Sequence, residues 1–168
     1  WGTITNWSLG TVPVSTDHVT IPNVTNKPVL DVNRAVGNIY IQSGSSVSLG
    51  TSVLTVVNDF NNEGELIYGT GTVNFNGTDA QSITGSSNFY HLTIDNSGGG
   101  VTIQSGKDSI TGTLTLTNGV FTTNDSLVFV SNASGTARIA EITGGSISGN
   151  IVAQRYLPAT DIAAWRSI

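Results

Sequence analysis

The carboxylates of this sequence are the side chains best suited to chemistry, because paired acids can exchange protons with a substrate or hold a cation. Glycoside hydrolysis requires two carboxyl groups on either side of the scissile bond, roughly 5 to 10 Å apart. Only Asp59, Glu63 and Glu65 lie close together in the sequence, and no basic residue accompanies them. Most other acids stand singly between turn-forming residues, so we predict no catalytic site in this segment.

Two histidines and the absence of cysteine limit the other kinds of site. Neither His18 nor His91 accompanies a G-x-S-x-G segment, which would place a nucleophilic serine on a sharp turn. His91 alternates with the apolar Leu92, so we expect its ring to point outward from a strand. With two imidazoles and no thiolate, we predict no transition-metal site.

Calcium is the one cofactor for which the sequence offers ligands, because Ca²⁺ accepts carboxylate, amide and carbonyl oxygens from loops. The candidate segments are DFNNEGE at 59–65 and NDS at 124–126, and their candidate ligands are Asp59, Glu63 and Asp125. Neither segment matches an EF-hand loop or the repeat of calcium-binding β-rolls. Because Asn and Asp also adopt tight turns for conformational reasons, turn formation is the favoured interpretation.

Three tyrosines are candidates for carbohydrate binding, because an exposed aromatic ring offers an apolar surface with a polar edge. Tyr40, Tyr68 and Tyr90 each neighbour apolar residues that compete for the interior, such as Ile39 and Ile41 around Tyr40. We therefore expect the three rings to point outward. A surface glycan is the ligand that this pattern indicates.

The composition excludes several classes of partner. The charged residues make up 10% of the chain, against about 25% in soluble domains generally. A net charge of −5 and a pI near 4.6 argue against nucleic acid and anionic membrane surfaces. No run of 18 apolar residues occurs, so no membrane span is predicted. Nearly half of the 168 residues are Gly, Ser, Thr or Asn, which indicates a turn-dense all-β fold.

Apolar and polar residues alternate almost throughout, as in Thr113-Leu114-Thr115-Leu116-Thr117. This period of two, interrupted by turn formers every few residues, predicts strands of three to five residues and almost no helix. A shift of 53 to 56 residues brings Ile39 onto Leu92 and Val73 onto Leu127, which suggests a unit of two or three solenoid coils.

Two folds satisfy this pattern. A β-sandwich would use longer strands joined by hairpins, for which Asn76-Gly77 and Asn118-Gly119 are suitable turns. A right-handed parallel β-helix needs only short strands and bends, with neighbouring coils supplying the hydrogen bonds. We predict the β-helix for residues 1–152, with Trp7 covering its N-terminal end, and keep the β-sandwich as the alternative.

Residues 6–22 read NW-x2-G-x2-P-x3-D-x-V-x-IP. Further segments of the same kind are GTVNFNG at 71–77, QSITG at 81–85 and GTLTLTNG at 112–119. Together they resemble the β-helical regions of large, adhesin-like surface proteins of the Bacteroidetes that are exported by type IX secretion. In this resemblance RYLPA at 155–159 marks the passage into a further β domain or a linker over residues 153–168.

The resemblance implies a secreted or cell-surface location and a place within a longer protein. It implies a non-catalytic structural or adhesive segment that the secretion machinery handles as cargo. The alternatives are a carbohydrate-binding module and an accessory part of a larger secreted hydrolase that acts on polysaccharides.

Overall fold

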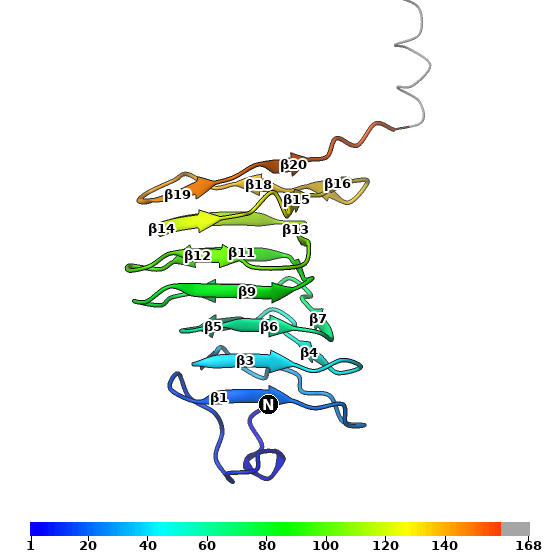
Figure 1. Cartoon of the computed structure of the whole chain (residues 1–168). Coiled ribbons are helices and arrows are strands. Elements are labelled where there is room, and N and C mark those ends of the chain that lie inside the picture. Colours follow the sequence, from blue (N-terminus) through cyan, green and yellow to red (C-terminus); the bar gives the residue numbers. More distant parts are fainter. Residues whose placement is uncertain (159–168) are drawn as a thin grey trace, which may run out of the picture.

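Short alternating strands are the building units of the fold, as the sequence predicts. The computed structural model describes residues 1–158, with 46% strand and 2% helix. Consecutive strands of the chain lie on different faces, and each strand outside the short β16–β17 hairpin pairs in parallel with the strand one turn above or below it. The result is a parallel β-helix of about seven turns, which confirms this prediction over the β-sandwich. In Figure 1 the turns stack upward from the N-terminal end.

Three faces make up each turn. The first contains β1 (His18–Ile21), β3 (Asn38–Ile41), β6 (Phe60–Asn62), β9 (Gln81–Gly85), β12 (Val101–Ile103), the end of β14 (Thr113–Thr122) and β19 (Gly145–Ser148). The second contains β2 (Arg34–Val36), β5 (Val53–Val56), β8 (Thr72–Phe75), β11 (His91–Asp95), the start of β14 and β18 (Arg138–Ile139).

The third face is divided into two separate sheets. One pairs β4 (Ser46–Ser48) with β7 (Glu65–Ile67), and the other contains β10 (Asn88–Phe89), β13 (Asp108–Ile110), β15 (Leu127–Phe129) and β20 (Ile151–Ala153). Within the described residues, no ladder joins β7 to β10. A small antiparallel hairpin of β16 (Ser131–Asn132) and β17 (Gly135–Thr136) projects between β15 and β18.

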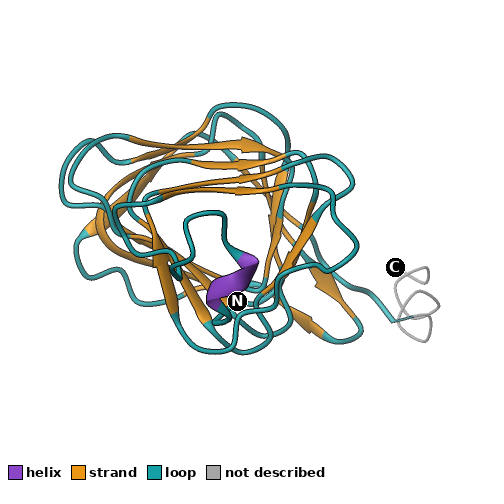
Figure 2. Ribbon diagram, turned by 90° about the horizontal axis from the view of Figure 1, so that it is seen from below, coloured by secondary structure: helices purple, strands orange, loops and turns teal. Residues whose placement is uncertain are grey.

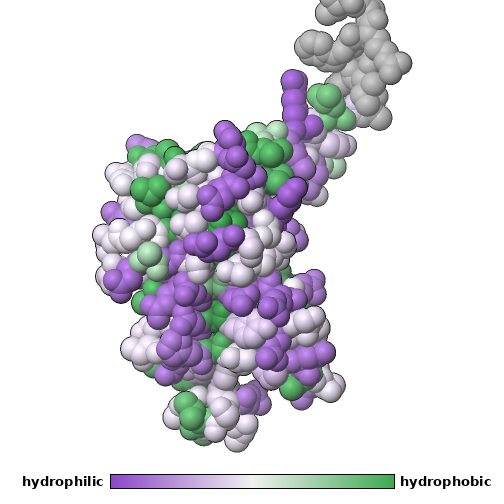
Figure 3. All heavy atoms as spheres, in the orientation of Figure 1, coloured by the Kyte–Doolittle hydropathy of each residue, from purple (hydrophilic) through white to green (hydrophobic). Residues whose placement is uncertain are grey.

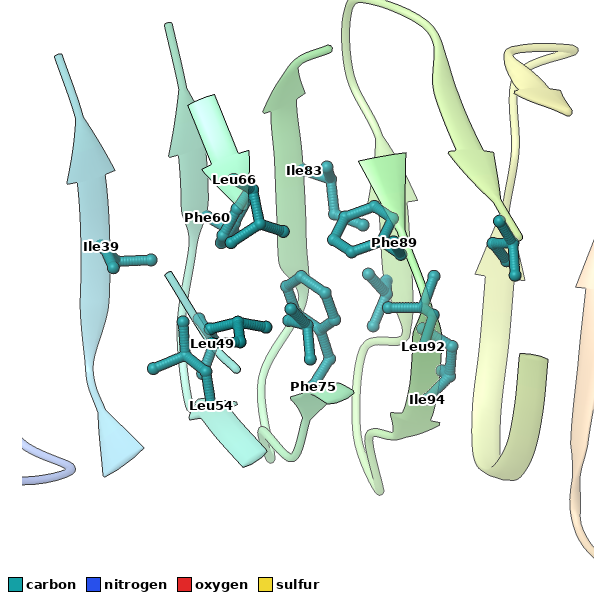
Figure 4. Packing of buried hydrophobic residues seen from close by; sticks show 14 of the residues in the cluster. Ile39, Leu49, Leu54, Phe60, Leu66, Phe75, Ile83, Phe89, Leu92 and Ile94 are labelled. Carbon is teal, nitrogen blue, oxygen red and sulfur yellow. The ribbon is translucent and has the colours of Figure 1, made fainter. Parts of the chain in front are cut away.

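Inward-pointing residues stack in columns along the axis. One column on the first face runs through residues in direct register: Val19, Ile39, Phe60, Ile83 and Ile103. Figure 4 shows such side chains filling the space between the faces. Phe60 contacts Phe75 and Phe89 with ring centroids 6.2 and 6.1 Å apart, so aromatic contacts connect the three faces.

One turn takes about 20 residues, and the predicted repeat of 53 to 56 residues is therefore wrong in register. Successive members of the column above lie 20 to 23 residues apart. The longer shift placed Ile39 of the first face on Leu92 of the second, and Val73 of the second on Leu127 of the third. Apolar and polar residues alternate in the same way on all three faces. Shifting the sequence over itself by two turns plus two faces therefore also aligns apolar residues.

The corner after the first face requires a left-handed backbone in most turns. Positive φ angles occur there at Gly44, Gly85, Gly106, Asp125 and Gly149. At Gly85 a Cβ atom would lie 1.9 Å from the carbonyl oxygen of Asn62 in the turn below, so only glycine fits.

The two ends of the β-helix differ. At the N-terminal end, the 3-10 helix η1 (Ile4–Asn6) lies across the opening seen in Figure 2. Trp7 contacts Trp1 with ring centroids 4.8 Å apart and donates its indole N–H to the Trp1 carbonyl oxygen at 2.9 Å. At the other end, β18 to β20 are mostly exposed. Most of the predicted following domain, 153–168, lies outside the described residues.

Phe60→Ala is expected to lower the free energy of unfolding by about 3 to 5 kcal/mol, because it leaves a cavity among fully buried rings. Denaturant titration followed by circular dichroism measures the change. Val120 is exposed on the first face, so Val120→Ala should alter the unfolding free energy by less than about 0.5 kcal/mol. Equal losses in the two variants would contradict the closed core.

Candidate functional site

Two of the three candidate tyrosines come together at one corner of the β-helix. Tyr68 follows β7 and Tyr90 follows β10, so they occupy matching positions in successive turns. Their rings are nearly parallel, with an interplanar angle of 15° and centroids 6.5 Å apart. The His91 ring meets Tyr90 edge-on at 4.5 Å, and both tyrosines are half-buried. This corner is therefore an aromatic surface that is partly open to solvent.

Tyr40 lies apart from this pair, on the outer surface of the first face. It belongs to β3, and its hydroxyl donates a 2.5 Å hydrogen bond to Oε2 of Glu63 in the next turn. The hydrogen bond to this carboxylate raises the pKa of Tyr40 above its usual value. The structure thus brings together Tyr68 and Tyr90 but not Tyr40.

A groove crosses the third face where β7 and β10 do not pair. It has a volume of about 400 Å³ and is lined by Asn62, residues 64–69, Ser86 and Asn88. We call it the β7–β10 groove. Tyr68 lies at one end, and Asn62 and Ser86 lie near the corner with the first face. Sequence reasoning missed this groove because strand alternation gives no sign of an interrupted ladder.

The candidate calcium ligands are held separately by protein hydrogen bonds. Asp59 and Glu63 lie at opposite ends of β6, and Asp125 lies before β15. Asp59 Oδ1 accepts from the Ser82 N–H and Oγ, each at 2.8 Å, and Asp125 Oδ1 accepts from the Asn150 N–H at 2.7 Å. Over residues 1–158, no three acidic or histidine side chains are grouped as a metal site would require.

The histidines likewise contact neighbouring turns. His18 pairs with the Asn38 side chain, and Nδ1 of His91 accepts the Thr113 N–H at 3.1 Å. His91 points outward and is half-buried. Neither ring is hydrogen-bonded to a serine hydroxyl in the described part of the chain, so no nucleophile triad forms there.

A buried carboxyl group that the sequence did not single out lies inside the corner between the first and third faces. Asp108 is 1% exposed, and its Oδ1 accepts the Ser87 N–H at 2.8 Å. Its Oδ2 is buried without a hydrogen-bond partner among the described residues. Burial raises the pKa of Asp108 to about 7, although the Ser87 hydrogen bond opposes this shift.

Buried side-chain amides form the hydrogen bonds at the corner between the second and first faces. Gln81 donates to the carbonyl oxygens of Val56 and Asn58 and accepts from the Gly77 N–H at 2.9 Å. Asn96, in the next turn, donates to Gln81 Oε1 at 3.0 Å. These side chains replace the strand ladder where the chain bends, so they serve the fold and are not free to bind a ligand.

A second hollow of about 660 Å³ lies beside the N-terminal cap. It is lined by the cap residues Trp1, Asn6, Trp7 and Ser8, and by residues 20–22 and 24–29. The Trp1 amino group donates to the Val29 carbonyl oxygen at 2.8 Å, which joins the cap to this loop. The hollow is thus the seam between cap and first turn.

The chain matches no family model, no curated protein and no solved structure. Among residues 1–158, no helix is long and apolar enough to cross a membrane.

Asp108→Asn is expected to stabilise the protein at pH 8 and to change little at pH 4. The unfolded chain releases the Asp108 proton near pH 4, whereas the folded chain holds it until about pH 7. Unfolding free energy therefore falls as pH rises between these values, by up to about 4 kcal/mol, and stays low above pH 7.

Denaturant titrations from pH 4 to pH 8 test this dependence. Asp79 is exposed, so Asp79→Asn is the matched control and should leave the pH profile of the unfolding free energy unchanged. Parallel profiles for the wild type and Asp108→Asn would show that Asp108 is not the buried titrating group.

Proposed function

We propose that this chain is a non-catalytic structural and adhesive segment of a secreted or cell-surface bacterial protein, exported as type IX cargo. The observation that supports it best is the stack of turns around one apolar interior, with the first and second faces paired along its whole length. Each turn adds roughly 4.8 Å along the axis, so about seven turns form a spacer of roughly 30 Å. Contacts between adjacent turns keep such a spacer stiff.

The outer surface supports the same function. Outward positions carry Thr, Ser and Asn in columns, such as Thr55, Asn74, Thr93 and Thr115 on the second face. Figure 3 shows mainly hydrophilic and near-neutral residues on the face that it draws, with smaller hydrophobic areas. A surface with few charges remains soluble through hydroxyl and amide groups, as an extracellular spacer requires.

The distribution of carboxylates argues against hydrolysis by this segment. Asp59 is bonded to Ser82, and Glu63 is bonded to Tyr40. Asp95 accepts hydrogen bonds from Asn76 and Asn118 in the turns on either side. Carboxylates used in this way join adjacent turns and do not face each other across an open cleft.

Surface location is tested by treating intact cells of the source organism with a protease and probing for residues 1–158 with an antibody. We expect the signal to disappear in wild-type cells and to remain in cells that lack a type IX secretion component, because the chain is then retained inside. A periplasmic protein is the control for cell integrity. Protection of the signal in intact wild-type cells would refute the proposed location.

Absence of catalysis is tested with the purified chain and a panel of soluble polysaccharides. We expect no release of reducing ends or unsaturated sugars above the rate of a heat-denatured sample. Reproducible turnover that is lost in Asp59→Asn or Glu65→Gln would overturn the proposal of a non-catalytic segment.

A further inference from the structure

We propose that the β7–β10 groove is a binding site for a neutral oligosaccharide, with Tyr68 as its aromatic contact. The proposal rests on the adhesive part of the function proposed above and names the class of ligand that this segment binds. It is based on the interrupted ladder, the paired tyrosines and the polar side chains that line the groove.

The interrupted ladder turns backbone polar groups toward the groove. Glu65 donates its N–H to the turn below, and the Ile67 carbonyl oxygen accepts from the same turn. Amide groups alternate in direction along a parallel strand, so the N–H and C=O of Leu66 point toward β10. No strand pairing with β10 is present in the described part of the chain to satisfy them.

On the opposite side of the groove, β10 also turns backbone polar groups toward the groove. The carbonyl oxygens of Ser87 and Phe89 accept hydrogen bonds from the turn above. The backbone N–H and C=O of Asn88 therefore point the other way, toward β7. Cα atoms of β7 and β10 approach within 8 Å, whereas an inserted strand would need roughly 9.6 Å between its two neighbours. No strand can therefore be added between β7 and β10, and the proposed sugar lies over the mouth of the groove, against the side chains that line it.

The aromatic end of the groove suits a sugar ring. A pyranose has an apolar surface of C–H groups and a rim of hydroxyl groups, and a tyrosine ring can contact the first while its hydroxyl bonds the second. The ring of Tyr90, in the next turn, is nearly parallel to the ring of Tyr68 and supports the Tyr68 ring from the side. Tyr68 is thus the one aromatic ring that lines the groove, and Tyr90 holds it in place.

The polar lining supplies directional hydrogen bonds to sugar hydroxyls. The side-chain nitrogen of Asn88 and the carboxylate of Glu65 have no hydrogen-bond partner within residues 1–158. An amide donor and a carboxylate acceptor on opposite sides of the groove can bind adjacent hydroxyl groups of one sugar.

The charge of the groove selects the class of glycan. Glu65 is the only charged residue that lines it, and the chain carries a net charge of −5. A uronic acid or sulfated sugar would be repelled, because no lysine or arginine lines the groove to compensate its charge. A neutral hexose or pentose polymer carries no such penalty.

Affinity electrophoresis of the whole chain tests the proposal, with glucomannan, xylan and β-glucan as neutral probes and polygalacturonate as the anionic probe. We expect retardation by at least one neutral polysaccharide and none by polygalacturonate. Isothermal titration with the matching hexasaccharide should give an affinity that Tyr68→Ala weakens by about tenfold or more. Glu65→Gln should weaken it less, because the amide oxygen still accepts.

Tyr40→Ala is the matched control, because Tyr40 is a half-buried tyrosine outside the groove. It should bind like the wild type. Tyr68→Phe keeps the ring and should retain most of the affinity, and thermal melting of each variant verifies folding. Failure of all three neutral polysaccharides to retard the chain would overturn the proposal. Equal affinity in wild type and folded Tyr68→Ala would also do so, while leaving the structural function intact.

Discussion

Every turn of this β-helix depends on the turn next to it, because its backbone hydrogen bonds and apolar contacts are made along the axis. Phe60, for example, is in register with Ile39 below it and Ile83 above it. The bends cannot use strand ladders, so buried polar side chains such as Gln81 and Asn96 continue the bonding between turns. An isolated turn would have neither, and the stack is therefore the smallest stable unit.

Alternation of apolar and polar residues predicted the strands, and their shortness, with few hairpin turns between them, favoured the β-helix over the β-sandwich. The period was wrong because faces of similar pattern are interchangeable in a comparison based on apolar positions. The glycines that permit a left-handed backbone give the correct period, because Gly85 and Gly106 mark the same corner one turn apart. A signal that reports backbone geometry distinguishes corners, whereas hydropathy distinguishes only inside from outside.

The candidate site was only partly accessible to sequence reasoning. Outward positions for Tyr68 and Tyr90 follow from alternation, but their pairing depends on the length of a turn, which determines the residues that become neighbours. Asp108 was missed because an aspartate between turn formers resembles a surface residue in sequence. Its burial results from the inward direction of that position on β13, where the neighbouring Ile110 also points inward.

The difference between the two ends gives the molecule a direction for folding. At the N-terminal end Trp7 packs against Trp1 and the apolar interior, whereas within residues 1–158 the last turn leaves Ile139 and Val152 exposed. Each later turn can therefore form against a preceding turn whose far end is already covered. A chain that emerges N-terminus first from a ribosome or a secretion pore can thus fold progressively, about 20 residues at a time, without waiting for its remainder.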